Sequence, residues 1–159
     1  MNYKSLIAVA ACMSFMMFGC NSNKQSGNES GSDTTNLMKE ADASKKDEKG
    51  IGKFKDVKIN HPLDQAMLAK GEPVFATKCF ACHKLTNEKL VGPGWKGVTD
   101  RRAPEWILNF ITNTNMMLDS DLVAQQLMVV CLVRMPNQSL TDDEARSVYE
   151  FMRKNDGKN

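Results

Sequence analysis

Apolar residues recur at helical spacing in the second half of the chain. The first such stretch follows Pro104, and proline is favoured in the first turn of a helix, so we predict a helix over 104–111. Its apolar stripe consists of Trp106, Ile107, Phe110 and Ile111. A second stretch is apolar almost throughout. It predicts a helix over 121–133, capped by Ser120 and buried on nearly all sides.

A third helix is predicted at the C-terminal end of the chain. Thr141–Glu144 has the pattern of a capping box, with acidic residues in the first turn of a helix over 141–155. The apolar face of this helix consists of Val148, Phe151 and Met152. No stretch shows the alternating pattern of a strand, so we expect an all-α fold.

The N-terminal residues have the pattern of an export signal. Lys4 precedes an apolar run over 6–18, which is short for a membrane span but typical of a signal-peptide core. The run ends at Gly19-Cys20, which resembles the end of a bacterial lipoprotein signal. That resemblance implies a signal peptide over 1–19, acylation of Cys20, and a lipid anchor on the periplasmic side of the cell envelope. Ordinary secretion with cleavage nearby is the alternative.

The residues after this signal are polar and of mixed charge. Six lysines and six acidic residues balance one another over 21–53, and apolar residues are almost absent. Such a segment buries too little surface to offset the entropy of ordering it. We therefore expect a disordered tether over 20–53, beginning at the lipidated cysteine, and a folded domain over 54–159.

The overall charge excludes one class of partner. Lysine and arginine number 21 against 19 acidic residues, a net charge of +2, which argues against a nucleic-acid binder. The charge is uneven, because 70–102 carries seven cations and three acids. That region is expected to steer acidic faces of partner proteins toward the domain.

The strongest chemical signal is Cys79-Phe80-Ala81-Cys82-His83, the C-x-x-C-H attachment sequence of c-type haem. Two thiols at this spacing can bond the two vinyl groups of one porphyrin, while the histidine ligates iron. A dithiol redox motif or a zinc site is the alternative. The first lacks a βαβ setting, and the second lacks another C-x-x-C pair. Cys131, in an apolar run, is expected to be a buried thiol without a redox role.

Several residues could supply a second axial ligand to the iron. Met135 is favoured, because it lies between two predicted helices and Pro136 biases it toward an extended conformation. Met116, Met117 and His61 are the alternatives, as is a site with no second protein ligand. A methionine ligand would raise the reduction potential relative to a pair of histidines.

The domain resembles a class I cytochrome c. Four pieces carry the resemblance: Gly71 and Phe75 four residues apart, the Gly-Pro-rich segment 91–98, Met135-Pro136, and the helix over 141–155. It implies about four helices wrapped around one covalent haem, with Gly71 allowing close approach of the last helix. Pro73 either begins a short helix or kinks a longer one.

The resemblance also implies roles for single residues. The carbonyl of Pro93 would accept a hydrogen bond from His83 and fix its tautomer. Trp95 stands where the family usually has leucine. Apart from the resemblance, the charges of this region suggest contacts to the haem propionates by Arg101 above all, and by Arg102, Trp95 and Lys96; a solvated surface is the alternative.

These features predict a membrane-tethered one-electron carrier rather than an enzyme. The expected partners are a quinol-oxidising complex or other donor, and a terminal reductase or oxidase as acceptor. The chain is also similar to the cytochrome c lipoproteins that accompany nitrous-oxide reductase, which implies that enzyme as an acceptor. The alternatives are a haem subunit of a larger respiratory complex and a haem-based gas or redox sensor.

Overall fold

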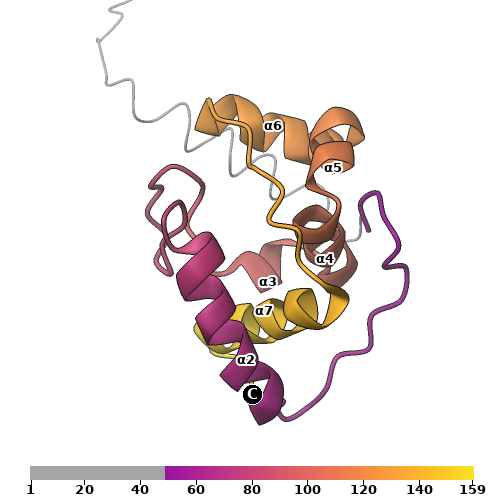
Figure 1. The fold of residues 1–159 in the computed structure, drawn as a ribbon, viewed down its shortest axis with the longest axis vertical. Helices are drawn as coiled ribbons and strands as arrows, with labels where there is room; N and C mark the ends of the chain where they lie inside the picture. The colour runs from indigo at the N-terminus through magenta and orange to yellow at the C-terminus, as the bar shows by residue number, and fades with distance from the viewer. Residues whose placement is uncertain (1–48) are drawn as a thin grey trace, which may run out of the picture.

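The computed structural model describes residues 49–159 (Figure 1). The predicted signal peptide, Cys20 and the tether up to residue 48 lie outside these residues. The helical elements are α2 (Gln65–Val74), the π-turn η1 (Phe75–Cys79), α3 (Val98–Arg101), α4 (Pro104–Thr112), α5 (Thr114–Ser120), α6 (Leu122–Cys131) and α7 (Asp142–Asn155). Within 49–159 there is no strand, only an isolated bridge between His83 and Lys89, so the all-α prediction is confirmed.

Helices α2 and α7 cross at the base of the molecule (Figure 1). A Cβ atom added to Gly71 would lie 2.1 Å from the carbonyl oxygen of Ser147, so only glycine permits this approach. Next to the crossing, the Phe75 and Phe151 rings lie 5.3 Å apart. The capping box at Thr141 is present, with both of its reciprocal hydrogen bonds. The predicted crossing and the predicted start of α7 are both confirmed.

Pro73 lies inside the longer of the two helices that the sequence allowed. It is the ninth of ten residues of α2, and the chain continues directly into η1. Proline has no N–H to donate at this point, and the next turn widens so that Phe80 N donates to Phe75 O at 2.9 Å. This wide turn brings Cys79 into the core, where it is 7% exposed.

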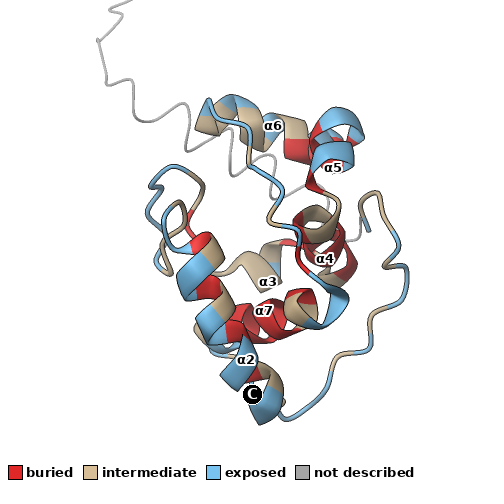
Figure 2. Cartoon of the chain, viewed as in Figure 1, coloured by how far each residue is buried: buried red, intermediate tan, exposed pale blue. Residues whose placement is uncertain are grey.

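The prediction for α6 is wrong in two respects. Asp121, not Ser120, is the N-cap, because its carboxylate accepts a hydrogen bond from Ala124 N, and the helix begins one residue later than expected. The helix is also not buried on all sides: Leu122 and Val129 are 63% and 68% exposed (Figure 2). Only Val123 and Ala124 are buried, because α6 packs mainly against the short helix α5 and leaves its outer face to solvent.

Two helices were not predicted, α3 and α5. Both are shorter than two and a half turns, which is too short for apolar periodicity to show in the sequence.

An extended segment before α2 runs past α4 along one side of the molecule, as Figure 1 shows. The fully buried Asn109 side chain binds it through three hydrogen bonds, accepting from Phe54 N and donating to Lys49 O and Phe54 O. Gly52 packs directly on this amide. Ordered packing therefore begins before Phe54, where the sequence placed the start of the domain.

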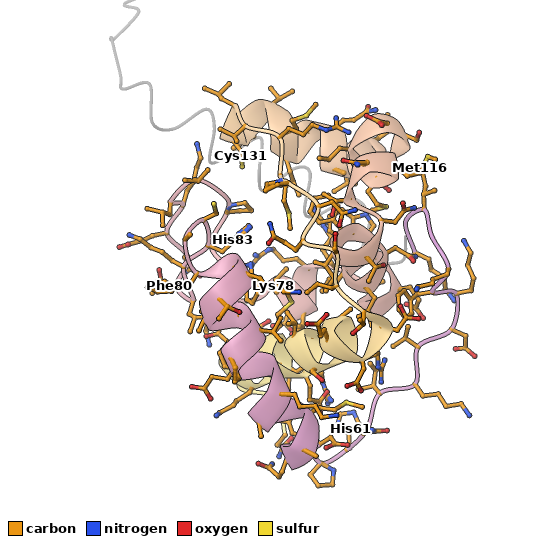
Figure 3. The ribbon with its side chains drawn as sticks, viewed as in Figure 1. His61, Lys78, Phe80, His83, Met116 and Cys131 are labelled. Atoms are coloured by element: carbon orange, nitrogen blue, oxygen red, sulfur yellow. The ribbon has the colours of Figure 1, made fainter. Side chains whose placement is uncertain are left out.

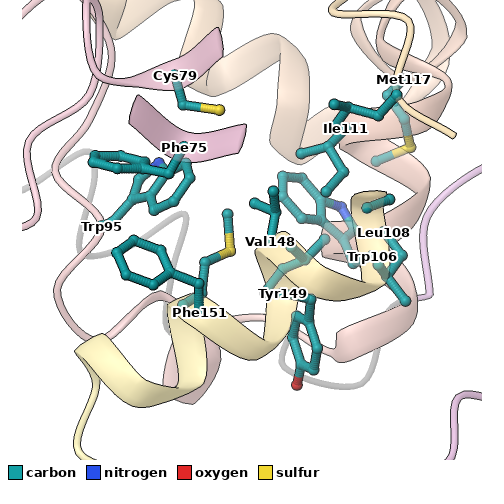
Figure 4. Close-up of a cluster of buried hydrophobic side chains, with 14 of the residues drawn as sticks. Phe75, Cys79, Trp95, Trp106, Leu108, Ile111, Met117, Val148, Tyr149 and Phe151 are labelled. Atoms are coloured by element: carbon teal, nitrogen blue, oxygen red, sulfur yellow. The ribbon is translucent and has the colours of Figure 1, made fainter. Parts of the chain in front are cut away.

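The buried side chains gather between α2, α4 and α7 (Figure 4). They include five aromatic side chains that the figure labels: Phe75, Trp95, Trp106, Tyr149 and Phe151. Among residues 49–159, no helix has the length and apolar composition needed to cross a bilayer.

Candidate functional site

The Cys79–His83 motif forms a compact turn that follows η1. The backbone N–H groups of Cys82 and His83 both donate to Cys79 O, at 3.1 and 3.0 Å. Cys79 is buried, whereas Cys82 and His83 are partly exposed; Figure 3 shows His83 next to the end of the α2–η1 segment. The turn therefore presents two thiols and one imidazole from five consecutive residues.

The imidazole of His83 is held by the loop over 91–94. Its Nδ1 lies 2.9 Å from Pro93 O, which is the predicted hydrogen bond. Burial lowers the pKa of His83, and the bond to Pro93 offsets part of that effect. The imidazole is therefore neutral near pH 7, with Nδ1–H donating to Pro93, and its Nε2 has the lone pair that a metal ligand needs.

Gly92 allows this close approach, and the sequence analysis did not assign it to the site. A Cβ atom at Gly92 would lie 2.3 Å from Cε1 of His83. The Trp95 ring packs against the same histidine, with centroids 5.7 Å apart, and against Phe75 at 4.7 Å. The tryptophan thus packs beside the imidazole and joins it to the aromatic core.

Two adjoining cavities open beside the motif. They share five lining residues: His83, Pro93, Phe110, Leu127 and Met135. The larger cavity has a volume of about 820 Å³, including the part open to solvent. Cofactor sites typically measure roughly 300–1,000 Å³ and are mostly apolar. The cavities together have the size and character of a site for one large planar cofactor.

Among the candidates for the second ligand, only Met135 lies at the cavities, where it lines both of them with His83. Met117 is fully buried elsewhere, and its sulfur accepts a hydrogen bond from Ile51 N at 3.0 Å. Met116 is 48% exposed (Figure 3), and His61 is exposed with its Nδ1 beside the terminal Asn159 carbonyl. None of these three lines either of the two cavities beside the motif.

Arg101 and Arg102 both line the larger cavity. Arg102 is only 3% exposed, and its guanidinium lies 5.2 Å from the centre of the Trp106 ring. Arg101 Nη1 donates to Lys96 O at 2.6 Å. The sequence named both arginines but could not show that Arg102 is the buried one. Lys96 itself does not line the cavity.

The two alternatives to haem attachment, a zinc site and a dithiol redox motif, lose support. Among the described residues, no group of three or more His, Cys, Asp or Glu side chains could hold a metal ion, which opposes a zinc site. Burial raises the pKa of Cys79 to about 11, so its thiol is not a reactive thiolate at neutral pH. Burial also raises the pKa of Cys131, a part-buried residue beside the smaller cavity.

The residues present fit a c-type haem. An apolar cavity, two cysteines at attachment spacing, and nitrogen and sulfur donors on the same cavity walls are the set that such a group requires. The glycine that keeps the Pro93 loop against His83 agrees with this interpretation.

Comparisons with known proteins agree with the interpretation of the cavities as a haem site. A family described as cytochrome c matches residues 68–156. A solved cytochrome c from Rhodothermus marinus is 31% identical, with a TM-score of 0.64 over 76% of this chain and 95% of that one. An engineered form of cytochrome c from the same organism, bound to a carbene intermediate, is 30% identical, with a TM-score of 0.61 over 78% and 98%. No curated protein matches the chain.

Proposed function

We propose that this chain, which belongs to the cytochrome c family, carries electrons in a respiratory chain while it is tethered to a membrane. Its family membership makes it a haem-based electron carrier with one covalent haem. In this role Cys79 and Cys82 attach the porphyrin, and His83 and Met135 are the axial ligands. The bound haem supplies reversible one-electron chemistry of its iron. The single observation that carries these assignments is that His83 and Met135 line the same two cavities.

The chain's own residues prepare the site for electron transfer. Pro93 holds the His83 tautomer, and apolar walls such as Leu127 and Phe110 exclude water. Ligation from both sides leaves no open position for a substrate, so we propose no catalytic activity. A thioether ligand favours the reduced iron and raises the potential. Arg101 and Arg102 are proposed as contacts for the propionates.

Electrons would leave through the apolar edge of the smaller cavity. Val91 and Val133 line this cavity and are 39% and 51% exposed, and Leu132 beside them is 85% exposed. A partner that covers this edge would bury apolar surface and shorten the distance to the haem.

The lysines near this edge are less available for steering than the sequence suggested. Lys84 pairs with Glu88 at 2.7 Å, and the pKa of Glu88 is lowered chiefly by its hydrogen bond to Lys84. Lys89 donates to Val130 O at 3.0 Å. We therefore propose that apolar contact contributes more to partner binding than salt-sensitive attraction does.

The location and the partners follow from the sequence pattern. We propose export by the signal over 1–19, lipidation at Cys20, and a periplasmic position on the membrane. The tether expected over 20–53 would let the domain reach several membrane partners without a fixed orientation. The proposed donor is a quinol-oxidising complex, and the proposed acceptor is a terminal reductase or oxidase, nitrous-oxide reductase among them.

An absorption and redox titration of the purified protein tests the proposal, together with thiol alkylation under denaturing conditions. We expect a six-coordinate haem spectrum, one reversible electron, and no alkylation of Cys79 or Cys82. A colourless product with both thiols alkylated would contradict the assignment. Ready formation of a carbon monoxide complex by the reduced protein would instead favour the sensor alternative. Purification in a fixed complex would favour the respiratory subunit.

A further inference from the structure

The C-terminal end of the chain is bonded to the loop that carries the site. Asn155 Nδ2, at the end of α7, donates to Leu85 O at 3.0 Å, and Lys96 Nζ donates to Asn155 O at 2.8 Å. Asp156, the next residue, makes the closest set of contacts. These bonds join two segments that are about sixty residues or more apart in the sequence.

Asp156 caps α3 from a distant part of the chain. The N-cap position of α3 is Gly97, which has a φ of 76° and no side chain that could cap. The Asp156 carboxylate caps the helix instead, since it accepts from Gly97 N at 2.5 Å, from Thr99 N at 2.8 Å and from Thr99 Oγ1 at 2.7 Å. A helix of four residues is not stable alone, so an external cap decides whether this turn forms.

The short helix that Asp156 caps carries the arginines of the cavity. Arg101 is the last residue of α3 and Arg102 is its C-cap, with Arg102 N donating to Val98 O. Val98, Arg101 and Arg102 all line the larger cavity. The position of the two guanidinium groups at the cavity wall therefore depends on the integrity of α3.

We propose that Asp156 is a positioning residue: by capping α3 it holds Arg101 and Arg102 at the cavity wall and so raises the reduction potential of the bound haem. The proposal rests on the proposed function. Fixed positive charge near the iron favours the reduced form, because reduction lowers the positive charge of the centre. If α3 unwinds, the guanidinium groups spend more time in water, where their effect on the iron is screened.

Two substitutions at this one position separate capping from charge. Asp156→Asn and Asp156→Ala both remove the carboxylate charge, but asparagine keeps one side-chain oxygen that can accept from the N–H groups of α3, whereas alanine keeps none. We expect the potential of Asp156→Ala to lie below that of Asp156→Asn. We also expect faster amide hydrogen exchange of Gly97 and Thr99 in the alanine variant.

The matched control is the same pair of substitutions at Asp143. This residue lies on α7, and it forms a surface pair with Lys70 in which both side chains are more than 60% exposed. Asp143→Asn and Asp143→Ala should have equal potentials. Thermal unfolding of all four variants measures the loss of stability that each substitution causes. A loss of stability alone would leave the reduction potential of the folded protein unchanged.

Equal potentials of folded Asp156→Asn and Asp156→Ala would overturn the proposal. If the alanine variant does not fold, Thr99→Val decides: it keeps the carboxylate and loses one of its three donors, and its potential should fall below that of the unchanged protein. An unchanged potential there would also overturn the proposal. A chain that binds no haem would contradict the proposed function, whereas equal potentials of the haem-loaded variants would contradict only the capping proposal.

Discussion

At the scale of single residues, the backbone itself holds the His83 ring. Gly92 lets the chain come close to the ring, and the next residue, Pro93, offers a carbonyl with no competing N–H of its own. A side chain at Gly92 would displace either the loop or the imidazole. The C-x-x-C-H motif was readable from the sequence, but this contact could be expected only through resemblance, because it depends on a loop that folds back.

The ligand assignment can be tested by replacing Met135. Met135→Ala should remove the long-wavelength sulfur-to-iron charge-transfer band and lower the potential, because the thioether that favours reduced iron is lost. Absorption spectroscopy and a redox titration measure both effects. Met116→Ala is the control, since Met116 is exposed and lies away from the cavities, and it should change neither. A band that persists in Met135→Ala would mean another ligand.

A second residue-scale prediction concerns pH. Burial raises the pKa of Tyr149 from about 10 to about 12. Between these values the native state holds the phenolic proton more tightly than the unfolded chain does, so the free energy of unfolding falls as the pH rises. Denaturant unfolding at a series of pH values measures the slope. Tyr149→Phe should make the slope shallower above pH 10, and an identical slope would show that this phenol does not contribute.

At the scale of elements, α6 differs most from its predicted form. Its sequence is apolar, yet a short helix can bury only the face that touches its neighbours, and here that face is narrow. It ends at Leu132 with a φ of 59°, the left-handed conformation that glycine or asparagine adopts more readily. An exposed leucine in this conformation is costly for folding, which agrees with its proposed role at the partner-binding edge.

Leu132→Asn should therefore stabilise the domain. Asparagine tolerates the left-handed conformation, and the leucine side chain is 85% exposed, so little packing is lost. We expect the free energy of unfolding to rise by about 0.5–1 kcal/mol in denaturant titrations. Leu122→Asn makes the same chemical change at an exposed helical position and should be neutral or slightly destabilising. Destabilisation by Leu132→Asn would contradict the strain argument.

At the scale of the whole molecule, the cavity is assembled from segments far apart in the sequence. The motif after η1, the α3 turn, α4 and the Met135 loop each contribute part of its wall, while the α2–α7 crossing supports it from below (Figure 1). The segment bound by Asn109 connects this body to the predicted tether.

The proposed anchor gives the prediction at this scale. Cys20→Ser should release the protein from membranes into the soluble fraction, because the acylated thiol is the proposed point of attachment. Cell fractionation with haem absorbance as the readout measures the distribution. Cys131→Ala is the control: it leaves the anchor in place and should keep both the membrane location and the spectrum. Membrane retention of Cys20→Ser would point to another means of attachment.

The sequence alone determined the features that short-range chemistry decides. The spacing of Cys79, Cys82 and His83 specifies the haem, and the capping box and apolar stripes specify α7 and α4, since each signal lies within a few turns of chain. The tertiary structure decided which methionine lines both cavities with His83, which face of α6 remains exposed, and which arginine is buried. These outcomes depend on packing between distant segments, and no local pattern encodes them.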